Sequence, residues 1–170
     1  ELGGRDEARV LRAPVHAGFL TNFDFERDPA RLQAFHREYD TADDVQLAGF
    51  RARGGKLLFF HGTADPIFSA LEMADYQQRL NAAHGESAAA GFARTFMVPG
   101  MTHCAGGPAT DSYDGLAAIV AWVEEGRAPE RISARGTQML PGVSRPLCPW
   151  PKVARYVSGD EKSEASFACR

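Results

Sequence analysis

The apolar residues of the chain follow two different spacings, and each spacing predicts a type of element. Residues 56–60 and 93–98 are short, largely apolar runs, and such runs are typical of strands buried in a parallel sheet. Over 69–83 and 112–125 the apolar residues recur three and four positions apart, which predicts two helices. The pattern therefore gives the order strand, helix, strand, helix.

The same pattern predicts which side chains of the helices face the core. In the helix over 69–83, which Gly85 should stop, the predicted inward residues are Leu71, Ala74, Leu80 and Ala83. In the helix over 112–125 they are Leu116, Ile119, Val120 and Val123. Asp111 is expected to cap the start of this second helix and Gly126 its end.

The remaining segments have weaker patterns. Residues 1–25 show no clear period and are interpreted as irregular structure. A helix is predicted from Asp28-Pro29 to about residue 39, and a short helix or turn over 44–50. From about Pro129 onward prolines are frequent, which predicts a tail of short strands and turns that wraps around the rest.

The alternation of strands and helices places two polar residues at equivalent positions. It favours an α/β fold, in which parallel strands are joined by crossover helices. Asp65 follows the first predicted strand, and His103 follows the second. In open sheets of this kind, ligands and catalytic groups collect beyond the carboxyl ends of the strands. Asp65 and His103 are therefore expected at one edge of the sheet.

Composition and charge narrow the class of protein only a little. The 170 residues fit one domain or a large piece of one, and 44% hydrophobic with 24% charged residues is ordinary for a soluble globular protein. A formal net charge of −3 without a basic stripe gives no reason to expect nucleic acid. No apolar run approaches the roughly 18 residues that a membrane helix needs. We therefore expect neither nucleic acid nor membrane as a partner.

The three cysteines, Cys104, Cys148 and Cys169, carry information about pairing and compartment. An odd number suggests that one thiol pairs outside this chain or stays free. Cys148 and Cys169 lie in the tail, where a disulfide closing a loop of about 20 residues would stabilise the fold by roughly 3 kcal/mol. Such a pair implies an oxidising compartment, whereas two reduced thiols in a cytosolic protein are the alternative.

The order of Asp65 and His103 along the chain fits one type of catalytic site. In serine hydrolases of the α/β type the chain order is nucleophile, acid, histidine, and the acid orients the ring that accepts the nucleophile's proton. On this pattern alone, Asp65 before Pro66 is more often a turn residue, and a loop histidine is more often a surface residue. The other histidines are His16, His36, His61 and His84, of which His61 could line a pocket but is better explained as a packed residue.

The nucleophile of such a site is not found in these residues. No Gly-x-Ser-x-Gly occurs. Ser87 lacks the second glycine, and Ser69 is better explained as a helix cap. Cys104 cannot easily serve His103, because the side chains of adjacent residues point apart. The nucleophile is therefore expected upstream.

Four blocks, in order along the chain, carry a more specific signal. They are Gly54-Gly55-Lys56-Leu57-Leu58 leading to His61-Gly62-x-x-Asp65-Pro66; Met97-Val98-Pro99-Gly100-Met101-Thr102-His103-Cys104 with Gly106-Gly107-Pro108; Trp122-Val123-Glu124-x-Gly126-x-Ala128-Pro129; and Arg145-Pro146-Leu147-Cys148-Pro149 with Ala154-Arg155-Tyr156 and Cys169. Together they resemble the tannase and feruloyl esterase family, from about Phe23 to the C-terminus. Thr63, where a tryptophan is common, and Ala109, where glycine is frequent, depart from the family pattern.

The resemblance implies an architecture. The fold is then the C-terminal part of an α/β-hydrolase core, with residues 1–170 forming one portion of a single catalytic domain and 130–170 its disulfide-stapled tail. The nucleophile elbow and a large lid inserted before the acid would lie outside this chain. A calcium ion is implied for that lid, so no metal ligand and no cofactor are expected among these residues.

The resemblance also implies roles for individual residues. Asp65 and His103 would be the acid and the base of the triad. The serine is expected upstream, directly after a cysteine that forms a disulfide with Cys104, while Cys148 pairs with Cys169. The upstream part of the same protein, linked through Cys104, is thus the expected partner, and the chain could also be one half of a processed, disulfide-linked enzyme.

The implied activity is that of a secreted or periplasmic serine esterase. It would hydrolyse carboxylic esters of aromatic acids, such as feruloyl or galloyl esters or a terephthalate monoester, and this chain alone is predicted to be inactive because it lacks the serine. The alternative is a degenerate hydrolase fragment that only binds aromatic ligands.

Overall fold

The computed structural model describes residues 24, 26–32 and 44–170, in two compact units, 1–43 and 44–170. In the first unit, α3 (Pro29–Leu32) follows Asp24, whose carboxylate accepts hydrogen bonds from the backbone N–H groups of Glu26 and Arg27. This short helix lies where the helix over 28–39 was predicted. The rest of that prediction, and nearly all of the irregular stretch over 1–25, lie outside the described residues.

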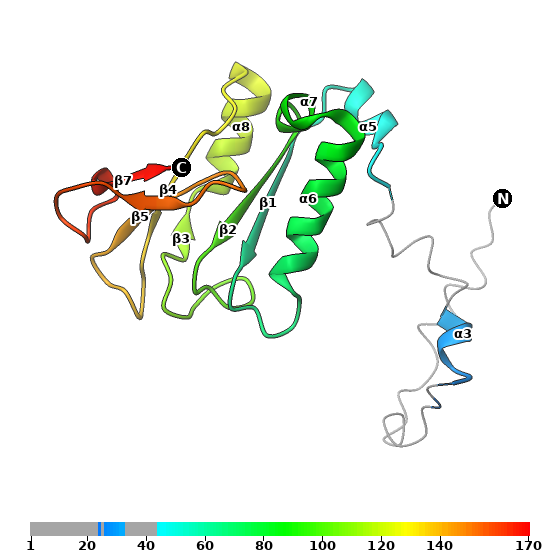
Figure 1. Cartoon of the computed structure of the whole chain (residues 1–170), viewed down its shortest axis with the longest axis horizontal. Helices are drawn as coiled ribbons and strands as arrows, with labels where there is room; N and C mark the ends of the chain where they lie inside the picture. Colours follow the sequence, from blue (N-terminus) through cyan, green and yellow to red (C-terminus); the bar gives the residue numbers. More distant parts are fainter. Residues whose placement is uncertain (1–23, 25, 33–43) are drawn as a thin grey trace. The chain divides into compact units, whose positions relative to one another are not determined.

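The second unit is built around a pair of parallel strands. Strand β1 (Leu57–Gly62) pairs with β2 (Ala93–Val98) in a register that runs from Leu57 opposite Ala93 to Gly62 opposite Val98. Both strands therefore end at the same edge (Figure 1). This pair confirms the two predicted strands, and β1 extends two residues beyond the predicted run.

Helices connect and flank the two strands. Helix α5 (Ala48–Ala52) precedes β1, and α6 (Ala70–His84) and α7 (Glu86–Ala90) join β1 to β2. Helix α8 (Gly115–Glu125) follows β2. Ser69 caps α6 at its start and Gly85 ends it, as predicted. The short α7 was not predicted, because its Glu-Ser-Ala-Ala-Ala sequence has no apolar period.

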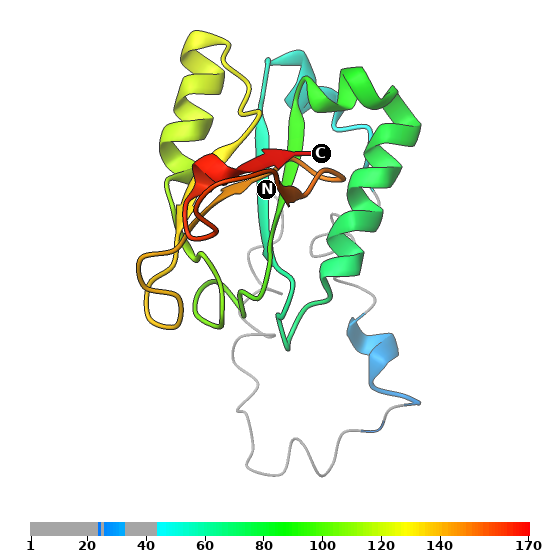
Figure 2. The same cartoon turned by 60° about the vertical axis from the view of Figure 1, so that its left-hand side comes forward.

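The strand pair is covered on both faces, and alternate residues contribute to different cores (Figure 2). On one face Leu80, Ala89 and Phe92 pack with Ala93. On the other face Phe96 and Val98 pack with residues of α8 and the C-terminal strands. β2 is mostly buried, whereas β1 is half-buried, because β2 is the only strand that pairs with β1 within the described part of the chain.

The predicted core faces of the two long helices are partly wrong. In α6, Leu80 is buried, but Leu71 is 79% exposed and Ala83 is also exposed. Gln77 takes a core position instead, because its side-chain oxygen accepts a hydrogen bond from the buried Thr95 hydroxyl, at 2.9 Å. A polar residue that finds a partner can thus occupy a site that the apolar pattern assigns elsewhere.

In α8 most of the predicted stripe faces outward: Leu116, Val120 and Val123 are exposed, and only Ile119 is half-buried. Trp122 is the buried residue, and cations lie near its ring, with Lys56 Nζ 5.4 Å and Arg94 Cζ 5.5 Å from the ring centroid. The sequence of α8 is apolar around most of the helix, so the period alone cannot select the inward face.

The start of α8 also differs from the prediction. The helix begins at Gly115, and its N-cap is Asp114, which accepts a hydrogen bond from the Ala117 N–H at 2.8 Å. Ser112–Tyr113 form the short strand β3. Asp111, the predicted cap, therefore does not cap the helix and makes other contacts.

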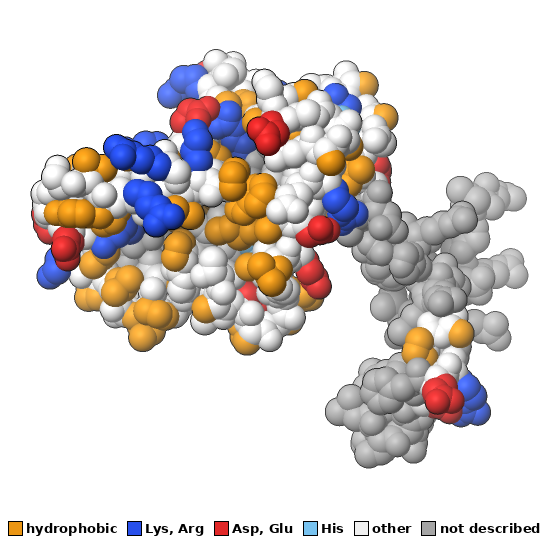
Figure 3. Space-filling view, in the orientation of Figure 1, with side chains coloured by type: hydrophobic (Ala, Val, Ile, Leu, Met, Phe, Trp, Pro, Cys, Tyr) orange, Lys and Arg blue, Asp and Glu red, His pale blue; other side chains and the backbone are white. Residues whose placement is uncertain are grey.

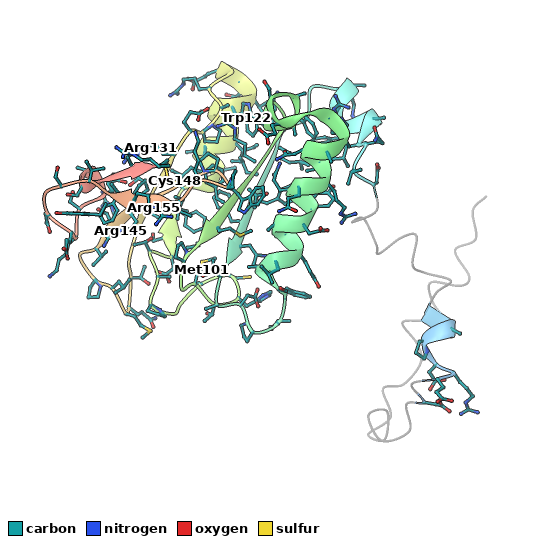
Figure 4. All side chains as sticks on the ribbon, viewed as in Figure 1. Met101, Trp122, Arg131, Arg145, Cys148 and Arg155 are labelled. Carbon is teal, nitrogen blue, oxygen red and sulfur yellow. A yellow bond between two sulfur atoms is a disulfide. The ribbon has the colours of Figure 1, made fainter. Side chains whose placement is uncertain are left out.

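The C-terminal part consists of short strands, as predicted. Strand β4 (Ile132–Arg135) lies between β3 and β5 (Ser144–Leu147) in an antiparallel sheet. In a second sheet β6 (Ala154–Tyr156) pairs with β7 (Phe167–Cys169), which follows the 3-10 helix η2 (Glu164–Ser166). A disulfide joins Cys148 to Cys169. Around these strands the side chains of Arg131, Arg145 and Arg155 are labelled in Figure 4, and Arg145 lies 4.1 Å from the centre of the Phe167 ring.

The search for membrane spans gave a negative result. No helix within the described ranges is long and apolar enough to cross a bilayer.

Candidate active site

The structure brings Asp65 and His103 together at the edge where both parallel strands end. Asp65 lies in the acid loop (residues 63–69), between β1 and α6, and His103 in the histidine loop (residues 99–111), between β2 and β3. His103 Nδ1 lies 2.8 Å from Asp65 Oδ2. The carboxylate can only accept, so Nδ1 carries the hydrogen. The contact that the strand pattern predicted is therefore present.

Asp65 is held by its own loop. Its Oδ1 accepts hydrogen bonds from the N–H groups of Ile67 (2.8 Å) and Phe68 (3.1 Å), and its side chain is only 5% exposed. Burial by itself would raise the pKa of Asp65. The hydrogen bonds from His103, Ile67 and Phe68 outweigh burial and lower the pKa to about 2. Asp65 is thus an anion at neutral pH.

His103 is oriented on one side and open on the other. Its side chain is 42% exposed, and Nε2 has no hydrogen-bond partner among the residues that the structure describes. The ring of Phe68 lies 5.5 Å away, between ring centres. In the neutral imidazole, a hydrogen on Nδ1 leaves the lone pair on Nε2. The arrangement can accept a proton from a group placed beside Nε2.

The two loops are joined through the backbone at the ends of the strands. Thr63 N–H donates to Val98 O, and Ala64 N–H donates to Met101 O, both at 3.0 Å. Gly62 lies so close to Met101, labelled in Figure 4, that a Cβ added there would be 2.2 Å from the Met101 carbonyl oxygen. Only glycine permits this approach without movement of the backbone.

Thr63 adds a side-chain link between the loops. Its hydroxyl oxygen accepts a hydrogen bond from Gly100 N–H at 2.9 Å. Thr63, a position expected to depart from the family pattern, thus provides a direct link from the acid loop to the histidine loop.

His61 supports the acid loop from β1. Its Nε2 lies 3.1 Å from Phe68 O, and a carbonyl oxygen only accepts, so Nε2 is the donor. The same nitrogen is 3.7 Å from Asp65 Oδ2. His61 is therefore a packed, hydrogen-bonded residue, as the sequence favoured, and it also lies beside the acid.

The other candidates have different surroundings. Ser69 Oγ accepts a hydrogen bond from Leu71 N–H, and Ser87 lies exposed in α7. His84 Nε2 lies 2.7 Å from Val45 O, while His16 and His36 are outside the described residues. Cys104 is exposed, with a free thiol within the described part of the chain. Within that part no group of three or more His, Cys, Asp and Glu side chains is arranged to hold a metal ion.

A cavity of about 630 Å³ lies at the other end of β2, away from His103. Its walls include Gln77, Arg94 and Trp150, on the face between α6 and the C-terminal strands where Figure 3 shows apolar side chains beside Lys and Arg. Two of its polar side chains already have partners: Gln77 bonds to Thr95, and Arg94 bonds to Glu130. Ligand chemistry is therefore better supported at Asp65 and His103.

Some site residues had no clear signal in the sequence. Phe68 is an exposed apolar side chain beside His103, and the only hint of it is the apolar pair Ile67-Phe68 directly after Asp65-Pro66. The contacts of Thr63 had no signal beyond its departure from the family pattern.

Comparison with known proteins shows which family the chain resembles. Residues 15–170 match the model of the tannase and feruloyl esterase family. The mono(2-hydroxyethyl) terephthalate hydrolase of Piscinibacter sakaiensis is 50% identical over 165 residues, which cover 90% of this chain and 27% of that protein. A probable feruloyl esterase of Arthroderma benhamiae is 36% identical over 161 residues, which cover 88% of this chain and 30% of that protein.

Solved structures show the same likeness. The crystal structure of feruloyl esterase B from Aspergillus oryzae has a TM-score of 0.72 and 28% identity, over 88% of this chain and 34% of that one. The tannin acyl hydrolase of Aspergillus niger has a TM-score of 0.62 at 24% identity, which supports the fold alone. The fold is that of the α/β-hydrolases, as the resemblance implied.

The chain spans about a third or less of the length of these relatives. Within that span the family match covers both strand ends, both loops and the C-terminal strands. The chain belongs to the tannase and feruloyl esterase family.

Proposed function

We propose that this chain supplies the acid and the base of a serine-type carboxylic ester hydrolase, with Asp65 as the acid and His103 as the base. The observation that carries the proposal is the 2.8 Å hydrogen bond between Asp65 Oδ2 and His103 Nδ1 at the carboxyl ends of two parallel strands. This is the contact by which an acid orients the histidine of a catalytic triad.

The surroundings of the pair suit its role. Asp65, an anion at neutral pH, holds His103 with Nε2 free to take the proton of a nucleophile. When His103 becomes the imidazolium, the same carboxylate stabilises the new charge. The serine oxygen bonds to the acyl carbon, the bond to the alcohol breaks, and His103 gives its proton to the leaving alcohol. Water then gives a proton to His103 and attacks the acyl-enzyme; the bond to the serine breaks, the serine oxygen takes the proton back from His103, and the carboxylic acid is released.

The nucleophile belongs, in this proposal, to a part of the protein that precedes these residues. A serine directly after a cysteine, in a Gly-x-Cys-Ser-x-Gly sequence, would complete the triad, and Cys104 would form a disulfide with that cysteine. The exposed position of Cys104, next to His103, supports such a link. This chain by itself would then be inactive. A disulfide-linked protein of this kind would be secreted or periplasmic.

The substrates proposed are esters of aromatic acids. The names of the relatives specify feruloyl esters and mono(2-hydroxyethyl) terephthalate. Beside His103 the exposed side chain of Phe68 offers an apolar surface of the kind that an aromatic ring contacts.

The test uses the full-length protein that the gene encodes, with methyl ferulate and mono(2-hydroxyethyl) terephthalate as substrates. His103→Ala should lower kcat by a factor of about 10³ or more, because the proton acceptor is lost. His84→Ala is the matched control and should retain turnover. The His84 ring is hydrogen-bonded to Val45 O, and neither residue belongs to the acid loop or the histidine loop. A full-length His103→Ala protein that still hydrolyses these esters at the wild-type rate would contradict the proposal.

The alternative is a degenerate hydrolase that binds aromatic ligands without turning them over. The exposed Phe68 beside His103 is the observation that favours it. In that case the wild-type protein should bind ferulate in a calorimetric titration yet hydrolyse none of the esters.

A further inference from the structure

Asp111 connects the histidine loop to a distant part of the chain. Its Oδ2 accepts a hydrogen bond from Gly106 N–H at 2.9 Å. Its Oδ1 accepts two more from Thr137, from the hydroxyl at 2.8 Å and from the N–H at 3.2 Å. Thr137 follows β4 and lies 26 residues further along the chain. One carboxylate thus joins a residue close to His103 to the antiparallel sheet.

The backbone around His103 has a conformation that few residues adopt. Cys104, Gly106 and Gly107 all have positive φ, of 65°, 79° and 79°. Cys104 is not a glycine, so its left-handed conformation is unfavourable in isolation. A segment of this kind persists when its surroundings over-determine it.

The hydrogen bonds inside the turn leave the Gly106 N–H for a partner outside it. Thr102 Oγ1 donates to Ala105 O at 2.5 Å, Ala105 N–H donates to His103 O at 2.9 Å, and Thr102 N–H donates to Gly106 O at 3.3 Å. These bonds close the turn on itself. The bond from Gly106 to Asp111 ties it to the rest of the fold.

Asp111 is suited to hold this turn as an anion. The hydrogen bond from Gly106, then that from Thr137, hold the pKa of Asp111 below its ordinary value. Hydrogen bonds to an ionised acceptor are shorter and stronger than neutral ones. Asp111 is not needed as a helix cap, because Asp114 caps α8.

We propose that Asp111, held by Thr137, is a positioning residue for His103: it fixes the turn that carries His103 so that Nδ1 stays within hydrogen-bond distance of Asp65. The inference rests on the proposed function, since His103 is taken as the base. Asp111 makes no contact with the His103 ring within the described residues and acts through the backbone of Gly106.

The test compares three variants of the full-length protein. Asp111→Asn keeps the shape of the side chain but removes its charge and turns one acceptor into a donor. Thr137→Val removes the hydroxyl donor and leaves the net charge unchanged. Asp114→Ala is the control, because it removes a neighbouring carboxylate and a helix cap without touching the histidine loop.

Two readouts separate positioning from general stability. The first is kcat and KM for methyl ferulate. The second is the rate at which the His103 Nδ1 proton exchanges with water, followed by NMR with 15N-labelled histidine. We expect Asp111→Asn to lower kcat about 10-fold with KM changed less than 2-fold, and to speed proton exchange at least 5-fold. Thr137→Val should lower kcat by a factor of about 3 and speed proton exchange by a factor of about 3. Asp114→Ala should change neither kcat nor proton exchange.

The outcomes distinguish this inference from the proposed function. If the wild-type protein turns over no ester, the proposed function fails, while the proton-exchange comparison still tests the positioning role. If the wild-type protein is active and both Asp111→Asn and Thr137→Val leave kcat and proton exchange unchanged, the positioning role is wrong. A lower kcat with unchanged proton exchange would also overturn it, since Asp111 would then act by another route. If Asp111→Asn fails to fold, Thr137→Val still decides the matter.

Discussion

The acid loop and the histidine loop emerge from neighbouring strands, yet they are held in different ways. The acid loop is short, and Asp65 organises it by accepting the N–H groups two and three residues ahead. The histidine loop has four residues with positive φ, and its turn is tied to the fold by Asp111, which itself bonds to Thr137. Asp65 thus accepts hydrogen bonds from its own loop, whereas the carboxylate that ties the histidine-loop turn also depends on Thr137, 26 residues further along the chain.

The two loops show two ways of fixing the position of a side chain in the site. When a carboxylate accepts hydrogen bonds from the N–H groups that follow it, only a few consecutive residues are needed. The local sequence is then enough to specify this part of the conformation. A loop that depends on close backbone approaches and on a distant threonine keeps its shape only when the sheet around it is assembled. Substitutions in the two loops should therefore differ in their effects on stability.

Gly107→Ala should strongly destabilise the histidine loop. Gly107 has a φ of +79°, and a Cβ there would lie 2.2 Å from Gly100 O. The left-handed conformation and the clash together should lower the free energy of unfolding by about 2–4 kcal/mol. Urea denaturation of wild-type and variant protein measures the loss.

Gly142→Ala is the matched control for that change. Gly142 has a φ of +77°, with no atom within 4 Å of an added Cβ. Only the conformational penalty remains there, about 1–2 kcal/mol. Equal losses for the two variants would mean that close packing does not hold the histidine loop.

Asp65→Asn should remove part of the acid sensitivity of the fold. The pKa of Asp65 is about 2 in the folded protein against an ordinary 3.8. Its contribution to stability is therefore complete above pH 3.8 and is lost as the pH falls through about 2. Unfolding measured at pH 6 and near pH 2.5 should show a smaller difference between the two pH values for Asp65→Asn than for the wild type.

The control for the acid measurement is Asp75→Asn, at an exposed position of α6. It should keep the wild-type difference between the two pH values. If Asp65→Asn also kept that difference, the hydrogen bonds to Asp65 would not order the acid loop in the way described.

Thr63→Val should have the smallest effect. The variant keeps the shape of the side chain and removes the acceptor of the Gly100 N–H. Because the position is exposed and water can replace the hydroxyl, the free energy of unfolding should fall by only about 0.5–1.5 kcal/mol. Hydrogen exchange of the Gly100 amide provides the local measurement, and unchanged protection would show that this link does not connect the loops.

The α/β alternation, both strands, the caps of α6 and the position of Asp65 and His103 at the ends of β1 and β2 could all be predicted from the order of the residues. These features depend on residues near one another in the chain, whose spacing records the local conformation. The sequence also carried the four blocks of the tannase and feruloyl esterase family, which the family match and the solved structures confirm.

Only the tertiary structure decided which face of α8 is buried, that Gln77 lies in the core, and that Asp111 holds the histidine loop rather than capping a helix. In each case the deciding partner is distant in the sequence: Lys56 and Arg94 for Trp122, Thr95 for Gln77, and Thr137 for Asp111. A hydrogen bond or a packed ring needs its partner within a few ångströms, and the order of residues along the chain does not specify that distance until the sheet has formed.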